Sequence, residues 1–229
     1  MTVTTNTGDI TKHRALKTPQ VLLGASVIEG IGGLAGVVLS ILGLAHIHPG
    51  AMAAVAAIAI GAGFLVEGGG VASRYNRLMQ AAGVNRENKM EIGGGSTAEF
   101  LGGAAGVVLG ILALLNIGGE VLTESAAIVF GATLVASAGS VAKLDAYRVQ
   151  DPEHPELNRV VDESTKVASG SQMLAGLGAI VLGIMALVGF SPMNLTLVAF
   201  LLVGASQLLS GTAVGGRAGE YEHVEHARA

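Results

Sequence analysis

The sequence has no cysteine, no tryptophan and few charged side chains. Of its 229 residues, 13% are Asp, Glu, Lys or Arg and 3% are aromatic, whereas a soluble domain has about 25% charged residues. The absence of cysteine excludes a disulfide scaffold, a thiolate metal site and a cysteine nucleophile. With 13 Lys and Arg residues and a net charge of −4, the chain is not expected to bind nucleic acid.

The sequence is rich in apolar residues and glycine, with 51% hydrophobic residues and 35 glycines. The apolar residues gather in six long runs, at 21–45, 51–72, 97–117, 122–142, 172–190 and 194–214. A helix of about 20 residues crosses about 30 Å of hydrocarbon, and the runs lack the polar stripe of a soluble amphipathic helix. We therefore predict an all-α integral membrane protein with six transmembrane helices and no cofactor.

Every Lys and Arg lies outside these runs, in segments that the six crossings put on one side of the membrane. The three short connections at 45–50, 116–121 and 189–194 contain none of them. Basic residues are retained on the cytoplasmic side, so we predict that both termini are inside. The polar, threonine-rich start of the chain is expected to be a cytoplasmic segment and not a signal peptide.

The six runs form three copies of one helical hairpin. The segment LAGVVLSILGL at 34–44 matches AAGVVLGILAL at 104–114, which begins 70 residues later, and LGAIVLGIMAL at 177–187, which begins 143 residues later. Copies in the same orientation are related by an axis along the membrane normal, which predicts a pseudo-threefold bundle. The predicted order is an inner segment, a hairpin, a linker, a hairpin, a linker, a hairpin and an inner tail, at 1–20, 21–72, 73–95, 96–142, 143–171, 172–214 and 215–229.

Small residues recur every four positions on the first helix of each hairpin. This ladder comprises Gly32, Gly36 and Ser40, then Gly102, Gly106 and Gly110, then Ala175, Ala179 and Gly183. Such spacing favours close packing of membrane helices. The alternative is a glycine-lined permeation path.

Polar side chains interrupt the apolar runs near their inner ends, at Glu29, Glu67, Glu99 and Gln172. Glu29, Glu99 and Gln172 are equivalent positions, three residues before the ladder, so they are expected on the face toward the bundle interior. Glu67 is equivalent to Ser137 and Ser210. A carboxyl group within the membrane is a functional hypothesis by default. The layer predicts either hydrogen bonds between helices at the inner rim or a cluster that responds to protons or cations.

The remaining polar residues predict no metal or catalytic site. His46 and His48 form a His-x-His pair, and histidine binds metals or titrates between about pH 5 and 8, but two ligands do not make a site. No nucleophile elbow, zinc-protease motif or phosphate-binding loop occurs, so we predict that the chain is not an enzyme. Residues 76–82 and 157–167 are predicted to form short amphipathic helices on the inner membrane surface, where a partner or sister subunit docks.

The three hairpins resemble a known family, and the third hairpin resembles it most closely. The segment LAGLGAIVLGIMALVGFSP at 174–192, followed by LLVGASQLLSG at 201–211, resembles the HdeD family of bacterial acid-resistance inner-membrane proteins. The resemblance implies a multi-pass protein built from a short two-helix repeat and a role in stress tolerance. It carries over no catalytic residues.

We therefore expect a non-enzymatic protein of the bacterial inner membrane that serves stress tolerance or is a structural component. It is expected to contact lipid and to form a homo-oligomer or join a membrane-protein partner. The alternative is a small-solute or proton-linked channel or transporter that uses the layer of Glu and Gln side chains.

Overall fold

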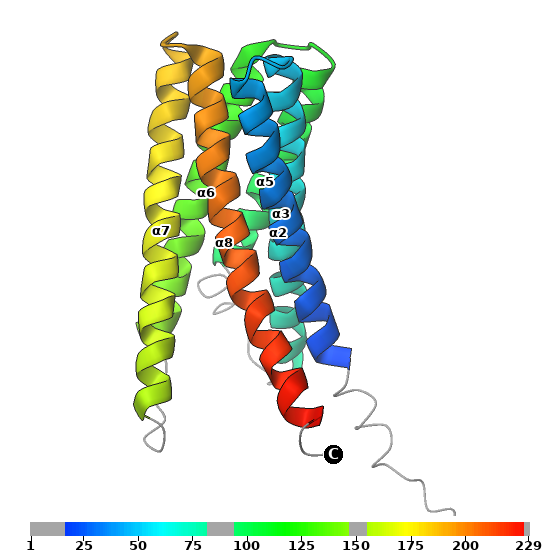
Figure 1. Cartoon of the computed structure of the whole chain (residues 1–229), viewed down its shortest axis with the longest axis vertical. Helices are drawn as coiled ribbons and strands as arrows, with labels where there is room; N and C mark the ends of the chain where they lie inside the picture. The colour runs from blue at the N-terminus through cyan, green and yellow to red at the C-terminus, as the bar shows by residue number, and fades with distance from the viewer. Residues whose placement is uncertain (1–16, 82–93, 147–154, 227–229) are drawn as a thin grey trace, which may run out of the picture.

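The computed structural model describes the backbone of residues 17–81, 94–146 and 155–226, and the side chains of residues 30–69, 97–139 and 169–210. The described backbone is helical and contains no strand (Figure 1). Its six helices are α2 (Lys17–Leu44), α3 (Pro49–Ala81), α5 (Gly94–Leu114), α6 (Glu120–Ala146), α7 (Pro155–Leu187) and α8 (Pro192–His226). The predicted all-helical class is confirmed.

Three tight turns join α2 to α3, α5 to α6 and α7 to α8 at one end of the molecule (Figure 1). Two residues after the end of each preceding helix lies a left-handed residue, with φ of 64° at His46, 59° at Asn116 and 98° at Gly189. The amide of each donates a hydrogen bond to the carbonyl three residues earlier, and the next amide reaches back five residues. This pair of bonds is the Schellman motif, so the same C-terminal capping motif ends all three helices.

At the opposite end, the helices extend beyond the predicted spans. The segments 76–82 and 157–167 were predicted to be separate surface helices, and this is wrong for the described residues 76–81 and 157–167; residue 82 lies outside the described residues. Residues 76–81 continue α3, and residues 157–167 belong to α7, which begins at Pro155. Neither stretch contains a glycine or proline that would interrupt the helix. Proline at the start of α7 is well placed, because the first amide of a helix has no intrahelical partner.

The helices are long and apolar enough to cross a membrane. Five of them contain an apolar stretch of sufficient length: Pro49–Gly69, Thr97–Leu114, Glu120–Gly139, Ser169–Leu187 and Pro192–Ser210. The apolar part of α2 that lies among the described side chains is the shorter Gly30–Leu44. The chain is therefore a multi-pass helical membrane protein by length and composition.

The six helices form a closed ring, in which each contacts the next along the chain and α8 contacts α2. The second helices of the three hairpins, α3, α6 and α8, also contact one another at the centre. They supply most of the fully buried apolar side chains, whereas α2, α5 and α7 carry most of the large exposed ones. In a membrane protein such an apolar outer surface faces lipid, since lipid tails are as apolar as leucine.

Candidate functional site

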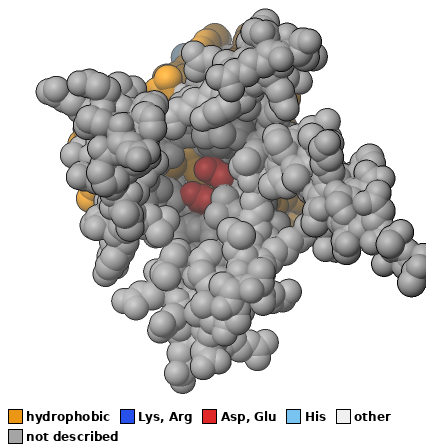
Figure 2. Space-filling view, turned by 90° about the horizontal axis from the view of Figure 1, so that it is seen from below, with side chains coloured by type: hydrophobic (Ala, Val, Ile, Leu, Met, Phe, Trp, Pro, Cys, Tyr) orange, Lys and Arg blue, Asp and Glu red, His pale blue; other side chains and the backbone are white. Residues whose placement is uncertain are grey.

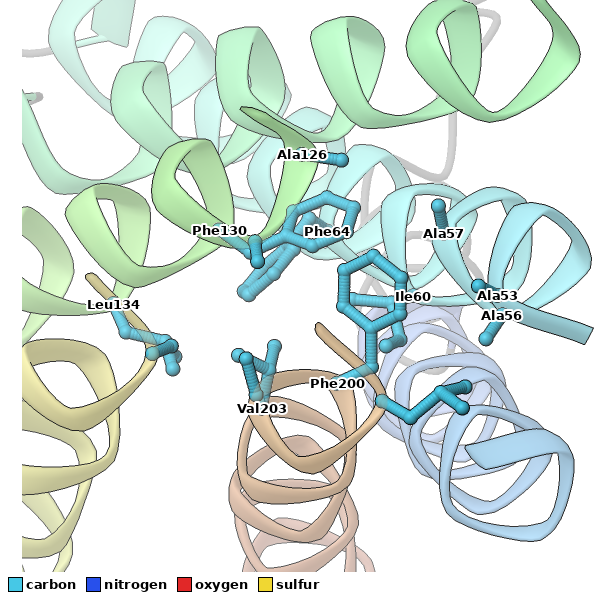
Figure 3. Close-up of a cluster of buried hydrophobic side chains, with 14 residues drawn as sticks. Ala53, Ala56, Ala57, Ile60, Phe64, Ala126, Phe130, Leu134, Phe200 and Val203 are labelled. Atoms are coloured by element: carbon cyan, nitrogen blue, oxygen red, sulfur yellow. The ribbon is translucent and has the colours of Figure 1, made fainter. Parts of the chain in front are cut away.

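The centre of the bundle is filled by three phenylalanines, one from each hairpin. Phe64 of α3, Phe130 of α6 and Phe200 of α8 are at most 1% exposed. Their side chains point toward one another in Figure 3, and consecutive ring centroids lie 5.7 Å (Phe64 to Phe130) and 5.8 Å (Phe130 to Phe200) apart. These distances are typical of favourable tilted aromatic pairs.

The three rings lie in successive layers of the axis. Using the sequence offsets of 70 and 143, Phe200 is equivalent to Ala57 and Ala127, Phe130 to Ile60 and Val203, and Phe64 to Leu134 and Gln207. Each layer therefore holds one phenylalanine and two smaller side chains, and each phenylalanine comes from a different hairpin. All nine of these residues are at most 1% exposed. The axis is closely packed at this depth.

Three pairs of glycines bring neighbouring hairpins into backbone contact. A Cβ added at Gly33 would lie 2.6 Å from the carbonyl oxygen of Gly204. The corresponding distance is 2.6 Å from Gly103 to Gly61 and 2.7 Å from Gly176 to Gly131. No real Cβ tolerates backbone atoms this close. Membrane helices approach so closely only where both lack side chains.

The ladder residues lie beside this contact and serve two interfaces. Within hairpins, a Cβ on Gly32 would lie 2.9 Å from the Ala59 oxygen and one on Gly36 2.6 Å from Ile60 Cγ1. Gly102 and Gly106 face Thr133 and Phe130 in the same way.

Farther toward the turns, the ladder meets the preceding hairpin. A Cβ on Gly110 would lie 2.8 Å from the Ala54 oxygen, and one on Gly183 would lie 2.7 Å from Ile128 Cγ1. Ser40 and Ala179 are 0% exposed, and Ala175 is half-buried against the core. The ladder residues therefore face neighbouring helices, and the ladder glycines pack directly against atoms of those helices.

The predicted polar layer lies at the end of the bundle opposite the turns. The amide Nε2 of Gln172 donates a 2.9 Å hydrogen bond to Ser210 Oγ, joining α7 to α8. In the second hairpin, the Glu99 carboxyl group is hydrogen-bonded to Ser137, which joins α5 to α6. These two pairs occupy equivalent positions in their hairpins.

The first hairpin departs from this arrangement because it places a carboxyl group where the others have serine. Glu67 is half-buried on α3, and its charge interacts with that of Glu99, which is 8% exposed. Acidic side-chain atoms are visible at the centre of the molecule when it is seen from this end (Figure 2). Glu29 lies on α2, outside the residues whose side chains are described.

A buried glutamine that the sequence analysis did not select lies one turn deeper. Gln207 of α8 is 1% exposed, and its Nε2 donates a 3.2 Å hydrogen bond to the Ile60 carbonyl of α3. Its Oε1 is buried without a hydrogen-bond partner among the described residues. The signal was available in the sequence, because the equivalent positions are Phe64 and Leu134, and an amide that replaces an apolar core residue is costly unless it is satisfied.

The turn end of the bundle carries the histidine pair. His46 and His48 both have positive φ, 64° and 45°, as do their equivalents in the other two turns. Within the part of the chain that the structure describes, no group of three or more His, Cys, Asp or Glu side chains is placed to hold a metal ion. Glu120 and Glu124 lie near this end of α6.

Comparison with protein-family models, with curated proteins and with solved structures finds no match for this chain. The resemblance to the HdeD family therefore stays an expectation.

Proposed function

We propose that this chain is a non-enzymatic structural protein of the bacterial inner membrane. It crosses the membrane six times as three parallel helical hairpins around a pseudo-threefold axis, with both termini in the cytoplasm. The three equivalent glycine pairs between hairpins support the repeat arrangement. The confinement of every Lys and Arg to the segments opposite the turns supports the orientation.

The observation that carries the structural role is the phenylalanine column at the centre of the bundle. A central pore needs a continuous polar or at least open lumen, whereas Phe64, Phe130 and Phe200 fill three successive layers with buried rings. Beyond them toward the turns, the axis is lined by alanines such as Ala53, Ala56 and Ala126, all 0% exposed. Small side chains bring helices together, so this half of the axis is also closed.

The exposed apolar faces of α2, α5 and α7 are the surfaces available to lipid or to sister subunits. Large side chains such as Leu34, Leu101 and Leu174 are about half or more exposed there, at 49%, 61% and 73%. A bundle of this kind serves the membrane through its packing and assembly. The stress-tolerance role implied by the HdeD resemblance is part of this proposal.

The alternative function is a proton-linked or small-solute channel or transporter that uses the layer of Glu29, Glu67, Glu99 and Gln172. The observation in its favour is the carboxyl pair within membrane-spanning helices, which is expensive to keep in lipid. One experiment separates the two functions. Purified protein in liposomes is tested for dissipation of a pH gradient and for swelling in small uncharged solutes.

The structural proposal expects flux equal to that of protein-free liposomes. Flux above that level that is lost in Glu99→Gln would overturn the proposal and establish the transporter. In the same preparation, light scattering of the detergent-solubilised protein gives the subunit count, which decides whether the outer faces bind sister subunits.

Topology is tested separately, and the absence of native cysteine makes this direct. Ile117→Cys places a thiol in an exposed turn and Gly170→Cys places one near the opposite end of α7, where a Cβ meets nothing within 4 Å. A membrane-impermeant maleimide added to intact cells is expected to label Ile117→Cys and to reach Gly170→Cys only after permeabilisation. The reverse labelling pattern would invert the orientation.

A further inference from the structure

We propose that the inner end of the bundle holds a hydrated divalent cation, with Mg²⁺ as the expected occupant, bound by Glu67, Glu99 and the side-chain oxygen of Gln207. This inference goes beyond the structural role, because a cation bound at one end does not need to cross the sealed axis. The Mg²⁺ titration below tests the cation site, whereas the liposome flux assay tests the structural role, so failure of one proposal is distinguishable from failure of the other.

The first observation is the pair of interacting carboxyl groups. Glu67 on α3 and Glu99 on α5 bring two acidic groups to one depth. Glu67 lies five residues before the end of the apolar run 51–72, and Glu99 lies two residues after the start of the run 97–117. At 1.5 Å per residue, Glu99 lies about 3 Å and Glu67 about 8 Å inside the ends of these runs, so a bound ion lies close to the water on that side.

The second observation is independent of the carboxyl groups. Gln207 Oε1 is an acceptor with no partner among the described residues, on a side chain that is 1% exposed. An unsatisfied buried acceptor costs about 1–3 kcal/mol, so its retention in an apolar layer points to a ligand that supplies positive charge or a donor.

The position of this oxygen connects it with the carboxyl pair. The Gln207 amide lies against Gly63 of α3, where an added Cβ would be 3.1 Å from Nε2 and 3.6 Å from Oε1. Nε2 reaches the Ile60 carbonyl, and the two terminal atoms of an amide point to opposite sides of Cδ. Oε1 therefore points away from Ile60, and Glu67 follows Gly63 by one helical turn on the same face of α3.

The chemistry of the donors selects the ion. All three ligands are oxygens, which suit Mg²⁺, Ca²⁺ and Mn²⁺, and two carboxylates balance a charge of +2. Mg²⁺ binds through one or two carboxylates and retains several waters, whereas Ca²⁺ takes six to eight oxygen ligands. Three ligand side chains, of which two are carboxylates, fit the first pattern better.

The test measures thermal unfolding of the purified protein, after chelation, as Mg²⁺ is added at constant ionic strength. The other hairpins supply conservative variants: Glu67→Ser copies Ser137, Glu99→Gln copies Gln172, and Gln207→Leu copies Leu134. Glu120→Gln, at the exposed outer end of α6, is the matched control. A ligand that binds only the folded state raises the unfolding temperature as its concentration exceeds the dissociation constant.

The expected result is a saturable rise in unfolding temperature for the wild type and for Glu120→Gln. Each of the three site variants is expected to need at least about tenfold more Mg²⁺, the lower end of the loss seen even when a partner of a metal ligand is removed. The proposal is overturned if the wild type shows no rise, if the site variants respond like the wild type, or if Na⁺ at equal ionic strength gives the same rise.

A second measurement covers the case in which a site variant does not fold. Mn²⁺, which binds similar oxygen ligands, is added to two single-cysteine proteins that carry a fluorinated label, Ser210→Cys near the site and Ile117→Cys in a turn. Paramagnetic broadening that is confined to the Ser210 label and reversed by Mg²⁺ supports the site. Equal broadening of both labels, or none, overturns it.

Discussion

The glycine pair that joins the first two hairpins gives the most direct test of the packing. Gly103 of α5 crosses Gly61 of α3, and a Cβ added at Gly103 would lie 2.6 Å from the Gly61 oxygen and 2.7 Å from the Leu65 amide nitrogen. Both neighbours are backbone atoms, so no side chain can rotate to make room. Gly103→Ala therefore has to move one helix away from the other.

The size of that movement sets the expected loss of stability. Ordinary Cβ contacts begin at 3.4 Å, so the helices have to separate by about 0.8 Å (3.4 minus 2.6) along a packed interface. Overpacking of a well-packed interior costs about 1–3 kcal/mol. Because two backbone atoms are met at once, we expect Gly103→Ala to lose about 2–3 kcal/mol of unfolding free energy.

The assay is reversible unfolding in mixed micelles by titration with a denaturing detergent, followed by far-ultraviolet circular dichroism. The matched control is Gly170→Ala in α7, where an added Cβ meets nothing within 4 Å, so this variant is expected to be neutral or to gain up to about 1 kcal/mol from helix propensity. Gly33→Ala and Gly176→Ala are expected to lose as much as Gly103→Ala. Equal stability of Gly103→Ala and Gly170→Ala would refute the close crossing.

Three further substitutions test other parts of the molecule with the same unfolding assay. Phe130→Ala removes the middle ring of the axial column and is expected to cost about 3–5 kcal/mol; a loss below about 1 kcal/mol would mean that the axis is loosely packed. His46→Gly relieves a non-glycine residue with φ of 64° and is expected to gain about 0.5–1 kcal/mol; a loss would show that the imidazole makes a stabilising contact. Glu99→Gln, measured without divalent cations, is expected to change stability by less than about 1 kcal/mol, because Gln172 already forms the equivalent hydrogen bond to Ser210; a larger loss would mean that the carboxyl group is needed for folding.

The sequence was informative about the helices because length and composition decide whether a segment is stable in lipid. Every apolar run lies mostly in a helix, and the ends opposite the turns differ from the expected ones where polar helix extends beyond the apolar run, as at residues 76–81. Hydropathy marks where an apolar run stops. It does not mark where a helix stops, since a polar sequence without glycine or proline continues the helix in water.

The sequence was less informative about which helix lies inside. The second helix of each hairpin is apolar nearly all round, so no polar stripe distinguishes the face toward the axis from the face toward lipid. The ladder drew attention to Gly32 and its equivalents, whereas the closest crossing between hairpins uses the adjacent residue, Gly33. Its recurrence as Gly103 and Gly176 at the repeat offsets was visible in the sequence. Adjacent residues of a helix point in different directions, so Gly32 and Gly33 face different neighbouring helices.

The pairing of polar residues was predictable only in part. Equivalence of Glu67, Ser137 and Ser210 placed them at one depth, and two of the resulting hydrogen bonds join the first and second helices of a hairpin. Gln207 was missed because equivalence selects polar positions that the hairpins share, whereas the positions equivalent to Gln207 are Phe64 and Leu134. Side chains that depart from a repeat are found by aligning the copies and looking for the positions at which they differ.

The phenylalanine column gives a physical reason for three hairpins to be joined in one chain under the proposed arrangement. Three identical hairpins around an axis would place three equal side chains in each layer, either three rings that crowd the axis or three small residues that leave it open. The fused chain instead places one ring in each of three layers, with Phe200, Phe130 and Phe64 following one another along the axis. Overpacking and cavities are both destabilising, so unequal copies fill an axial space that equal copies cannot. The same freedom lets Gln207 occupy a single position of the Phe64 layer, which a symmetric trimer of hairpins would have to repeat three times.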